Sequence, residues 1–71
     1  MIQANGIYRH KHTGDYVVAG QPNCDFVDIR VLTRDLNVSG GFVLETHMAV
    51  QPQRVPIKRL LKDWQFIKEL K

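Results

Sequence analysis

The order of apolar and polar residues along the chain indicates a mainly β domain. Gly6 to His12 and Tyr16 to Ala19 are short runs rich in aromatic and β-branched residues, and Thr13-Gly14-Asp15 between them is typical of a tight turn. Runs separated by so short a turn favour antiparallel pairing. We therefore expect a β-hairpin near the start of the chain.

A second, longer hairpin is predicted from strict alternation. Phe26 to Thr33 has a period of two, which places Val27, Ile29 and Val31 on one face of a half-buried strand. Phe42 to Val50 resumes the alternation after a loop that contains two glycines. Because the two runs are consecutive and similar in length, we expect them to pair with each other.

The last part of the chain changes from a strand period to a helical one. Pro52 ends the second hairpin, because proline has no N–H to donate to a neighbouring strand. Pro56 suits the first turn of a helix. Apolar residues then recur at the helical positions i, i+3, i+4 and i+7, namely Ile57, Leu60, Leu61 and Trp64. The pattern leaves Gln65 to Leu70 open between a last strand and a continuation of the helix.

These elements predict a single SH3-like β domain over residues 1–71. Four short strands with tight turns favour a small SH3-like barrel or a strongly bent antiparallel sheet of four to five strands, with one short C-terminal helix. The competing architecture is an open sheet with that helix laid across its apolar face. A chain of 71 residues is too short for a second core.

The amino-acid composition excludes several classes of protein. The chain is 44% hydrophobic and 24% charged, which is typical of a folded protein. No apolar run approaches the roughly 20 residues that cross a bilayer, and the first residues lack the basic and apolar regions of a secretory signal. Cys24 is the one cysteine, so no internal disulfide forms. We expect a cytoplasmic protein with no membrane partner.

The positive charge gathers towards the C-terminal end. Residues 1–51 hold four Lys and Arg against five Asp and Glu, whereas residues 52–71 hold six against two, so the two parts carry −1 and +4. Such asymmetry fits an anionic partner, and it also fits an ordinary solvated surface. The candidate anion-binding or nucleic-acid-binding residues are Arg54, Lys58, Arg59 and Lys62, with Lys68, Arg9 and Lys11 as additions.

Nucleic-acid binding by a small β domain also needs exposed rings on which bases stack. The strand and helix patterns assign four aromatic residues to the core: Phe26, Phe42, Trp64 and Phe66. Tyr8 and Tyr16 are then the expected exposed rings. Together with His10 they are the candidate partner-binding residues on the face of the first hairpin.

The opening of the chain also resembles a known family. Gly6 to His10 reads G-x-Y-R-H, and the family's next positions are matched by Lys11, Gly14, Tyr16 and Val18. This pattern is similar to that of a family of small bacterial and phage proteins described as a domain of unknown function. The resemblance implies a compact SH3-like β domain and an origin in a phage or another mobile element. It implies no catalytic residues, because the family has no assigned activity.

Catalytic and metal chemistry find little support in the residues. His10 and His12 lie two apart on a predicted strand and His47 lies on another, so three imidazoles on one face would suit zinc. No Cys, Asp or Glu is spaced to complete that site, and strand-borne histidines near an Arg and a Lys are usually solvated surface groups. Ser39 lacks the G-x-S-x-G turn of a nucleophile, and Cys24 has no signature around it. We predict no metal, no cofactor and no enzyme.

The expected function is therefore that of a non-catalytic binding or adaptor module, a phage or mobile-element accessory protein that acts on a host protein or sequesters a ligand. Two alternatives stay open. One is a nucleic-acid-binding protein that uses the basic C-terminal segment, and the other is an oligomeric enzyme or ligand-binding assembly with its site between subunits. A small domain without a disulfide gains stability by self-association, so a homodimer or higher homo-oligomer fits either case.

Overall fold

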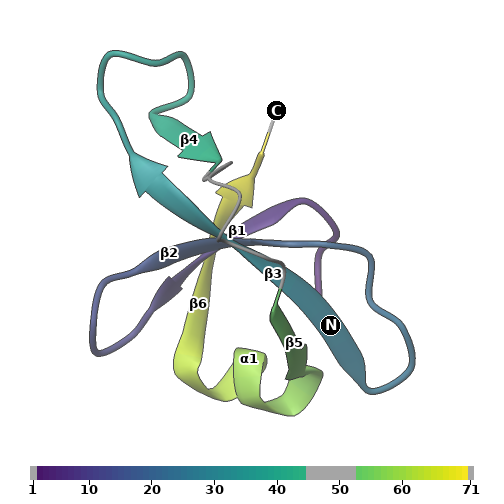
Figure 1. The fold of residues 1–71 in the computed structure, drawn as a ribbon. Coiled ribbons are helices and arrows are strands. Elements are labelled where there is room, and N and C mark those ends of the chain that lie inside the picture. The colour runs from purple at the N-terminus through teal and green to yellow at the C-terminus, as the bar shows by residue number, and fades with distance from the viewer. Residues whose placement is uncertain (1, 45–52, 71) are drawn as a thin grey trace.

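The computed structural model describes residues 2–44 and 53–70 (Figure 1). It contains six strands and one short helix: β1 (Gly6–His10), β2 (Tyr16–Ala19), β3 (Phe26–Arg34), β4 (Phe42–Leu44), β5 (Gln53–Pro56), α1 (Ile57–Asp63) and β6 (Trp64–Glu69). The mainly β class is confirmed, with six described strands where four to five were predicted. In this part of the chain no helix is long and apolar enough to cross a membrane.

The strands form one antiparallel sheet in the order β4-β3-β2-β1-β6. β3 is the longest strand, and its first half pairs with β5 while its second half pairs with β4. The sheet is not closed into a barrel. β5 pairs with β3 near one edge of the sheet and β6 pairs with β1 at the other edge, and within the described residues these two edges do not pair with each other. α1 connects β5 to β6 across the open end of the sheet (Figure 1). The predicted antiparallel sheet is therefore confirmed and the closed barrel is not; Leu60 of α1 packs in the cluster on one face of the sheet, as in the competing open-sheet architecture.

The first hairpin confirms the prediction but is shorter than expected. β1 and β2 pair from Ile7 opposite Val18 to Arg9 opposite Tyr16. β1 ends at His10 and does not continue to His12, because the chain turns there. The Nδ1 atom of His10 accepts two backbone N–H groups, from residues 12 and 13, at 3.1 and 3.2 Å. The side chain of His10 thus closes the turn that was predicted to be strand.

The sheet buries one apolar cluster on each face. The larger cluster holds Ile2, Tyr8, Val17, Ala19, Val27, Ile29 and Leu60. The smaller one, on the opposite face, holds Ile7, Val18 and Leu32. Neighbours along a strand, such as Ile7 and Tyr8, enter different clusters because side chains alternate across a sheet.

The alternation predicted for β3 holds for only part of the strand. Val27 and Ile29 are buried as expected, but Val31 is 48% exposed and Leu32 is 4% exposed. The larger cluster ends at Ile29, so Val31 extends beyond it on the same face. Leu32 lies on the other face and fills the smaller cluster. The buried side of β3 therefore changes along its length.

The C-terminal part differs from the prediction at β5 and at the end of the helix. The strand β5 was not predicted; the strand predicted from Phe42 to Val50 is described only as far as Leu44, and its remainder and Pro52 lie outside the described residues. α1 ends at Asp63, because Trp64 is extended with a φ of −122° and its N–H caps the helix on the carbonyl of Leu60. Trp64 is thus the first residue of β6, and the open question over residues 65–70 is settled in favour of a strand that runs to Glu69.

Candidate functional site

The three predicted partner-binding residues do not form one surface. Tyr8 is 2% exposed, and its hydroxyl accepts the backbone N–H of Gln3 at 3.1 Å, so it is a core residue and not an exposed platform. Tyr16 pairs with Leu32 and belongs to the opposite face, where its ring meets that of Phe42 at 5.0 Å. His10 shares the face of Tyr8. The prediction of a single binding face on the first hairpin is therefore wrong.

The exposed rings are two that the sequence assigned to the core. Phe26 is 46% exposed and Phe66 is 47% exposed, whereas Phe42 and Trp64 are half-buried. Phe66 lies opposite Tyr8 in the β1–β6 pairing, and the Tyr8 ring fills the core beneath it. Phe26 points to the face opposite Val27, at an end of the sheet that the smaller cluster does not reach. Stacking platforms are thus present, at different positions from those predicted.

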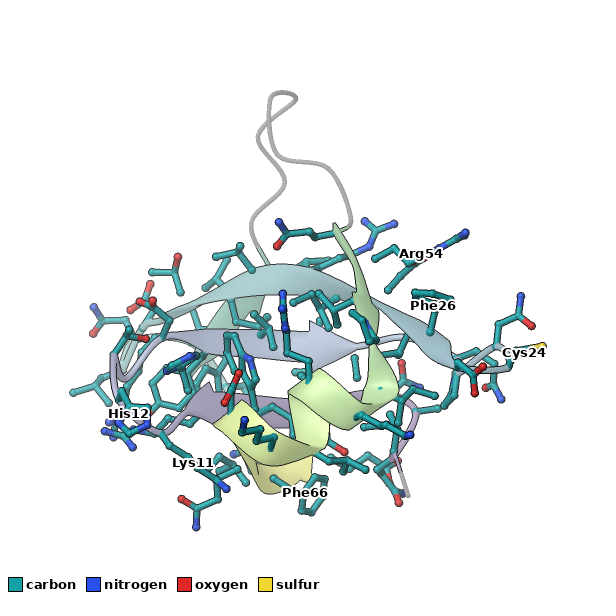
Figure 2. The ribbon with its side chains drawn as sticks, turned by 90° about the horizontal axis from the view of Figure 1, so that it is seen from below. Lys11, His12, Cys24, Phe26, Arg54 and Phe66 are labelled. Atoms are coloured by element: carbon teal, nitrogen blue, oxygen red, sulfur yellow. The ribbon has the colours of Figure 1, made fainter. Side chains whose placement is uncertain are left out.

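The predicted basic residues divide into two groups. Arg54 lies on β5, and its Nε contacts an Asp28 carboxylate oxygen at 3.4 Å. This is the one ion pair within residues 2–44 and 53–70. Lys58, Arg59 and Lys62 lie on α1 and are exposed. Arg54 therefore has its charge balanced locally, and it lies away from Phe66 and Lys11 (Figure 2).

The three cations of α1 lie within an arc of about 100° on the helix, with Lys62 between Lys58 and Arg59. At about 100° per residue, Lys58 and Lys62 lie within about 60° and 100° of Leu61, whereas Arg59 lies about 160° away. Asp63, the one acidic residue of α1, lies about 40° from Arg59, on the side away from Lys62. Lys58 and Lys62 are thus the cations nearer to the exposed Leu61 side chain, and Arg59 lies between Lys62 and Asp63.

Lys11 joins these lysines from a distant part of the sequence. Its Nζ donates to the backbone carbonyl of Lys62 at 2.9 Å, and its backbone N–H donates to the carbonyl of Asp63. Both bonds fix the end of β1 against the end of α1. Arg9, the other addition considered from the sequence, pairs with Tyr16 and therefore faces the opposite side of the sheet.

A small apolar hollow lies between α1 and β6. It has a volume of about 260 Å³ and is lined by Gln3, Tyr8, Leu61, Trp64 and Phe66. We define the α1–β6 surface as this hollow together with the lysines beside it, Lys11, Lys58 and Lys62. Figure 2 shows Phe66 and Lys11 on the side of the molecule that α1 and β6 form. The surface thus combines exposed apolar side chains with cations that form no ion pair within the described residues.

A larger hollow of about 570 Å³ lies at the loop between β2 and β3. Its wall includes Phe26, Cys24, Asp28 and Arg54. Cys24 is exposed and has a φ of 55°, at the first position of a two-residue turn that the backbone of Asn23 and Phe26 closes with two hydrogen bonds. Because the Arg54 charge is met by Asp28, this hollow offers a weaker site for an anion than the α1–β6 surface does.

His10 and His12 do not lie on one strand, as the zinc site considered from the sequence requires. His12 lies in the turn and not on β1, and the rings of His10 and His12 are 5.9 Å apart. The Nδ1 of His10 is already an acceptor in that turn. His47 lies outside the described residues. Within the described ranges, no three His, Cys, Asp or Glu side chains gather as metal ligands would.

Comparisons with known proteins add no family. No family model, no curated protein and no solved structure matches the chain. The resemblance in the opening residues therefore stays a prediction, and the functional argument rests on the chain's own geometry.

Proposed function

We propose that the protein is a non-catalytic binding module that holds an anionic partner on the α1–β6 surface. The observation that carries this proposal is that α1 bears Lys58 and Lys62, is contacted by Lys11 at its end, and also provides Leu61 to an exposed apolar hollow. Opposite charge would draw the partner in, and burial of the hollow on contact would supply further affinity. The bent sheet with its late helical turn also fits the predicted SH3-like class, and the family resemblance supports an accessory role in a phage or mobile element.

The exposure of the three lysine side chains suits binding of a partner at the protein surface. All three lysines are exposed, so their ammonium groups are hydrated and act as steering charges. Affinity from such contacts falls as salt rises, because ions screen charges over about 10 Å at 0.1 M. The apolar hollow is less sensitive to salt. A partner that uses both features would therefore bind with a moderate salt dependence.

The test is retention on a sulfated polysaccharide such as immobilised heparin, which presents anionic groups on a flexible chain. The double variant Lys58→Glu with Lys62→Glu is compared with Arg30→Glu combined with Arg34→Glu. Both pairs are exposed and both change the net charge equally, but the arginines lie on β3. We expect the lysine variant to elute at clearly lower salt than the arginine variant. Equal elution of the two would refute the proposed surface.

A further inference from the structure

We propose that the anionic partner is single-stranded nucleic acid, with one base stacked on Phe66 and the neighbouring phosphates against Lys11, Lys58 and Lys62. This inference rests on the proposed function and names the partner of the same surface. A nucleic-acid strand alternates one anionic phosphate with one planar base. The α1–β6 surface offers a complementary arrangement, because the helix that provides Leu61 to the aromatic hollow also bears Lys58 and Lys62, and Lys11 contacts its end.

Phe66 has the properties of a stacking platform. Its ring is 47% exposed, and its edge is held against the buried Tyr8 ring at 5.5 Å with an interplanar angle of 68°. Tyr8 is itself fixed by the core cluster and by its hydrogen bond from Gln3. β6 also pairs with β1 from Trp64 to Phe66 and again at Lys68 and Glu69, with a register shift between the two stretches. The platform is therefore held in place before the ligand arrives, which lowers the entropic cost of binding.

The hollow beside Phe66 suits one planar group. Its volume of about 260 Å³ lies below the roughly 300–1,000 Å³ of pockets that enclose a whole small molecule. Leu61 and the half-buried Trp64 form its apolar walls. A single base would cover this apolar surface while its sugar and phosphate remain in water. Longer contact would then follow the lysines along α1.

The lysines set the expected electrostatics. Each phosphate contact on a single strand contributes a slope of about −0.7 to the logarithm of the binding constant against the logarithm of the salt concentration. Three contacts, from Lys11, Lys58 and Lys62, predict a slope of about −2. This slope is smaller than that of a protein whose affinity comes from phosphate contacts alone. Base stacking, which depends little on salt, supplies the rest of the binding free energy.

Other partners fit this surface less well. In a duplex the base faces are stacked on each other, so Phe66 would have none to contact. An acidic peptide satisfies the lysines but lacks a planar group next to each charge. The surface therefore favours a single strand over a duplex and over an acidic protein segment.

The test is fluorescence polarisation with labelled probes of about twelve nucleotides, a length within the range of about 4–16 bound by one small β domain. The probes are oligothymidine, oligouridine, an abasic strand of equal length and a duplex. Stacking is worth about 5- to 150-fold per base, so we expect the two base-bearing single strands to bind more tightly than the abasic strand by a factor in this range. The first two probes distinguish DNA from RNA as the source.

Matched variants assign the effect to residues. Phe66→Ala and Phe66→Leu should each weaken base-bearing strands about 5-fold or more and change abasic binding less than about 2-fold. The leucine variant keeps an apolar side chain over Tyr8, so it controls for unfolding. Lys62→Glu should weaken all single strands and reduce the salt slope by about 0.7, whereas Arg59→Glu, at the cation of α1 farthest from Leu61 and next to Asp63, should have a smaller effect.

The outcomes of these experiments distinguish failure of the nucleic-acid inference from failure of the proposed function. If abasic and base-bearing strands bind equally, base stacking is wrong while the anionic surface of the proposed function stands. If heparin retains the protein through Lys58 and Lys62 but no oligonucleotide binds, the nucleic-acid partner is wrong. Tighter binding of the duplex, or of an acidic peptide, would overturn the inference in favour of that partner. Loss of both heparin and oligonucleotide binding would overturn the proposed function as well.

Discussion

Replacing Leu60 by alanine should remove much of the domain's stability. Leu60 is 0% exposed and is the one buried residue of α1, where it packs in the cluster that contains Val27 and Ile29. Truncation of such a leucine costs about 2–5 kcal/mol, because the cavity only partly collapses. At about 0.05–0.15 kcal/mol per residue, a domain of this length has a total stability of about 4–11 kcal/mol. About half of the stability would therefore be lost.

The neighbouring leucine provides a matched control. Leu61 is 43% exposed, so Leu61→Ala should change stability by less than about 1 kcal/mol while weakening oligonucleotide binding. Urea unfolding of both variants can be followed by the fluorescence of Trp64, the one tryptophan of the chain, which directly follows α1. A Leu60→Ala midpoint equal to that of the unmodified protein would refute the docking of α1 on the sheet. Equal losses in the two variants would show that Leu61 is buried.

Three further substitutions test local features. Gly6→Ala would place a Cβ 2.8 Å from the Gln3 carbonyl, so the melting temperature should fall by the equivalent of about 1–3 kcal/mol, and an unchanged value would contradict this close approach. Cys24→Gly should raise the free energy of unfolding in urea by about 0.5–1 kcal/mol, because relief of the positive φ outweighs the conformational entropy that glycine loses on folding. A lower free energy of unfolding would contradict the turn geometry. Lys68→Ala removes a 3.1 Å bond from Nζ to the Gly40 carbonyl, so amide exchange in residues 35–41 should become faster while β1 is unaffected, and unchanged exchange would contradict this contact.

The sequence predicts the local elements of this fold better than its long-range pairing. The first hairpin follows from two apolar runs and a glycine turn that are adjacent in the chain. β5 was not predicted because Gln53-Arg54-Val55-Pro56 has no apolar alternation. It is a strand because the first half of β3 offers it a partner. The helical period of the sequence continues to Trp64. In the structure Trp64 instead begins β6, because it pairs with His10 of β1.

The candidate surface could be predicted only in part. The basic residues of α1 were found from charge, but a period of two cannot tell which of two apolar faces a core will cover. Phe66 and Phe26 were therefore assigned to the core, and Tyr8 to the surface, in the reverse of what the structure shows. The contact between Lys11 and Lys62 joins residues 51 positions apart. No local pattern encodes such a contact, and it follows only from the pairing of β1 with β6.

Leu60, the one buried residue of α1, would couple ligand binding on the proposed surface to the stability of the whole domain. The helix that carries two of the three lysines also connects β5 to β6, which lie at different edges of the unclosed sheet. A ligand bound to this helix would therefore stabilise the contact between the two edges. Such a ligand binds the native chain and not the unfolded one, and at one hundred times its dissociation constant it would add about 2.7 kcal/mol to the free energy of unfolding. A domain this small would then be most resistant to heat and proteolysis while it is occupied.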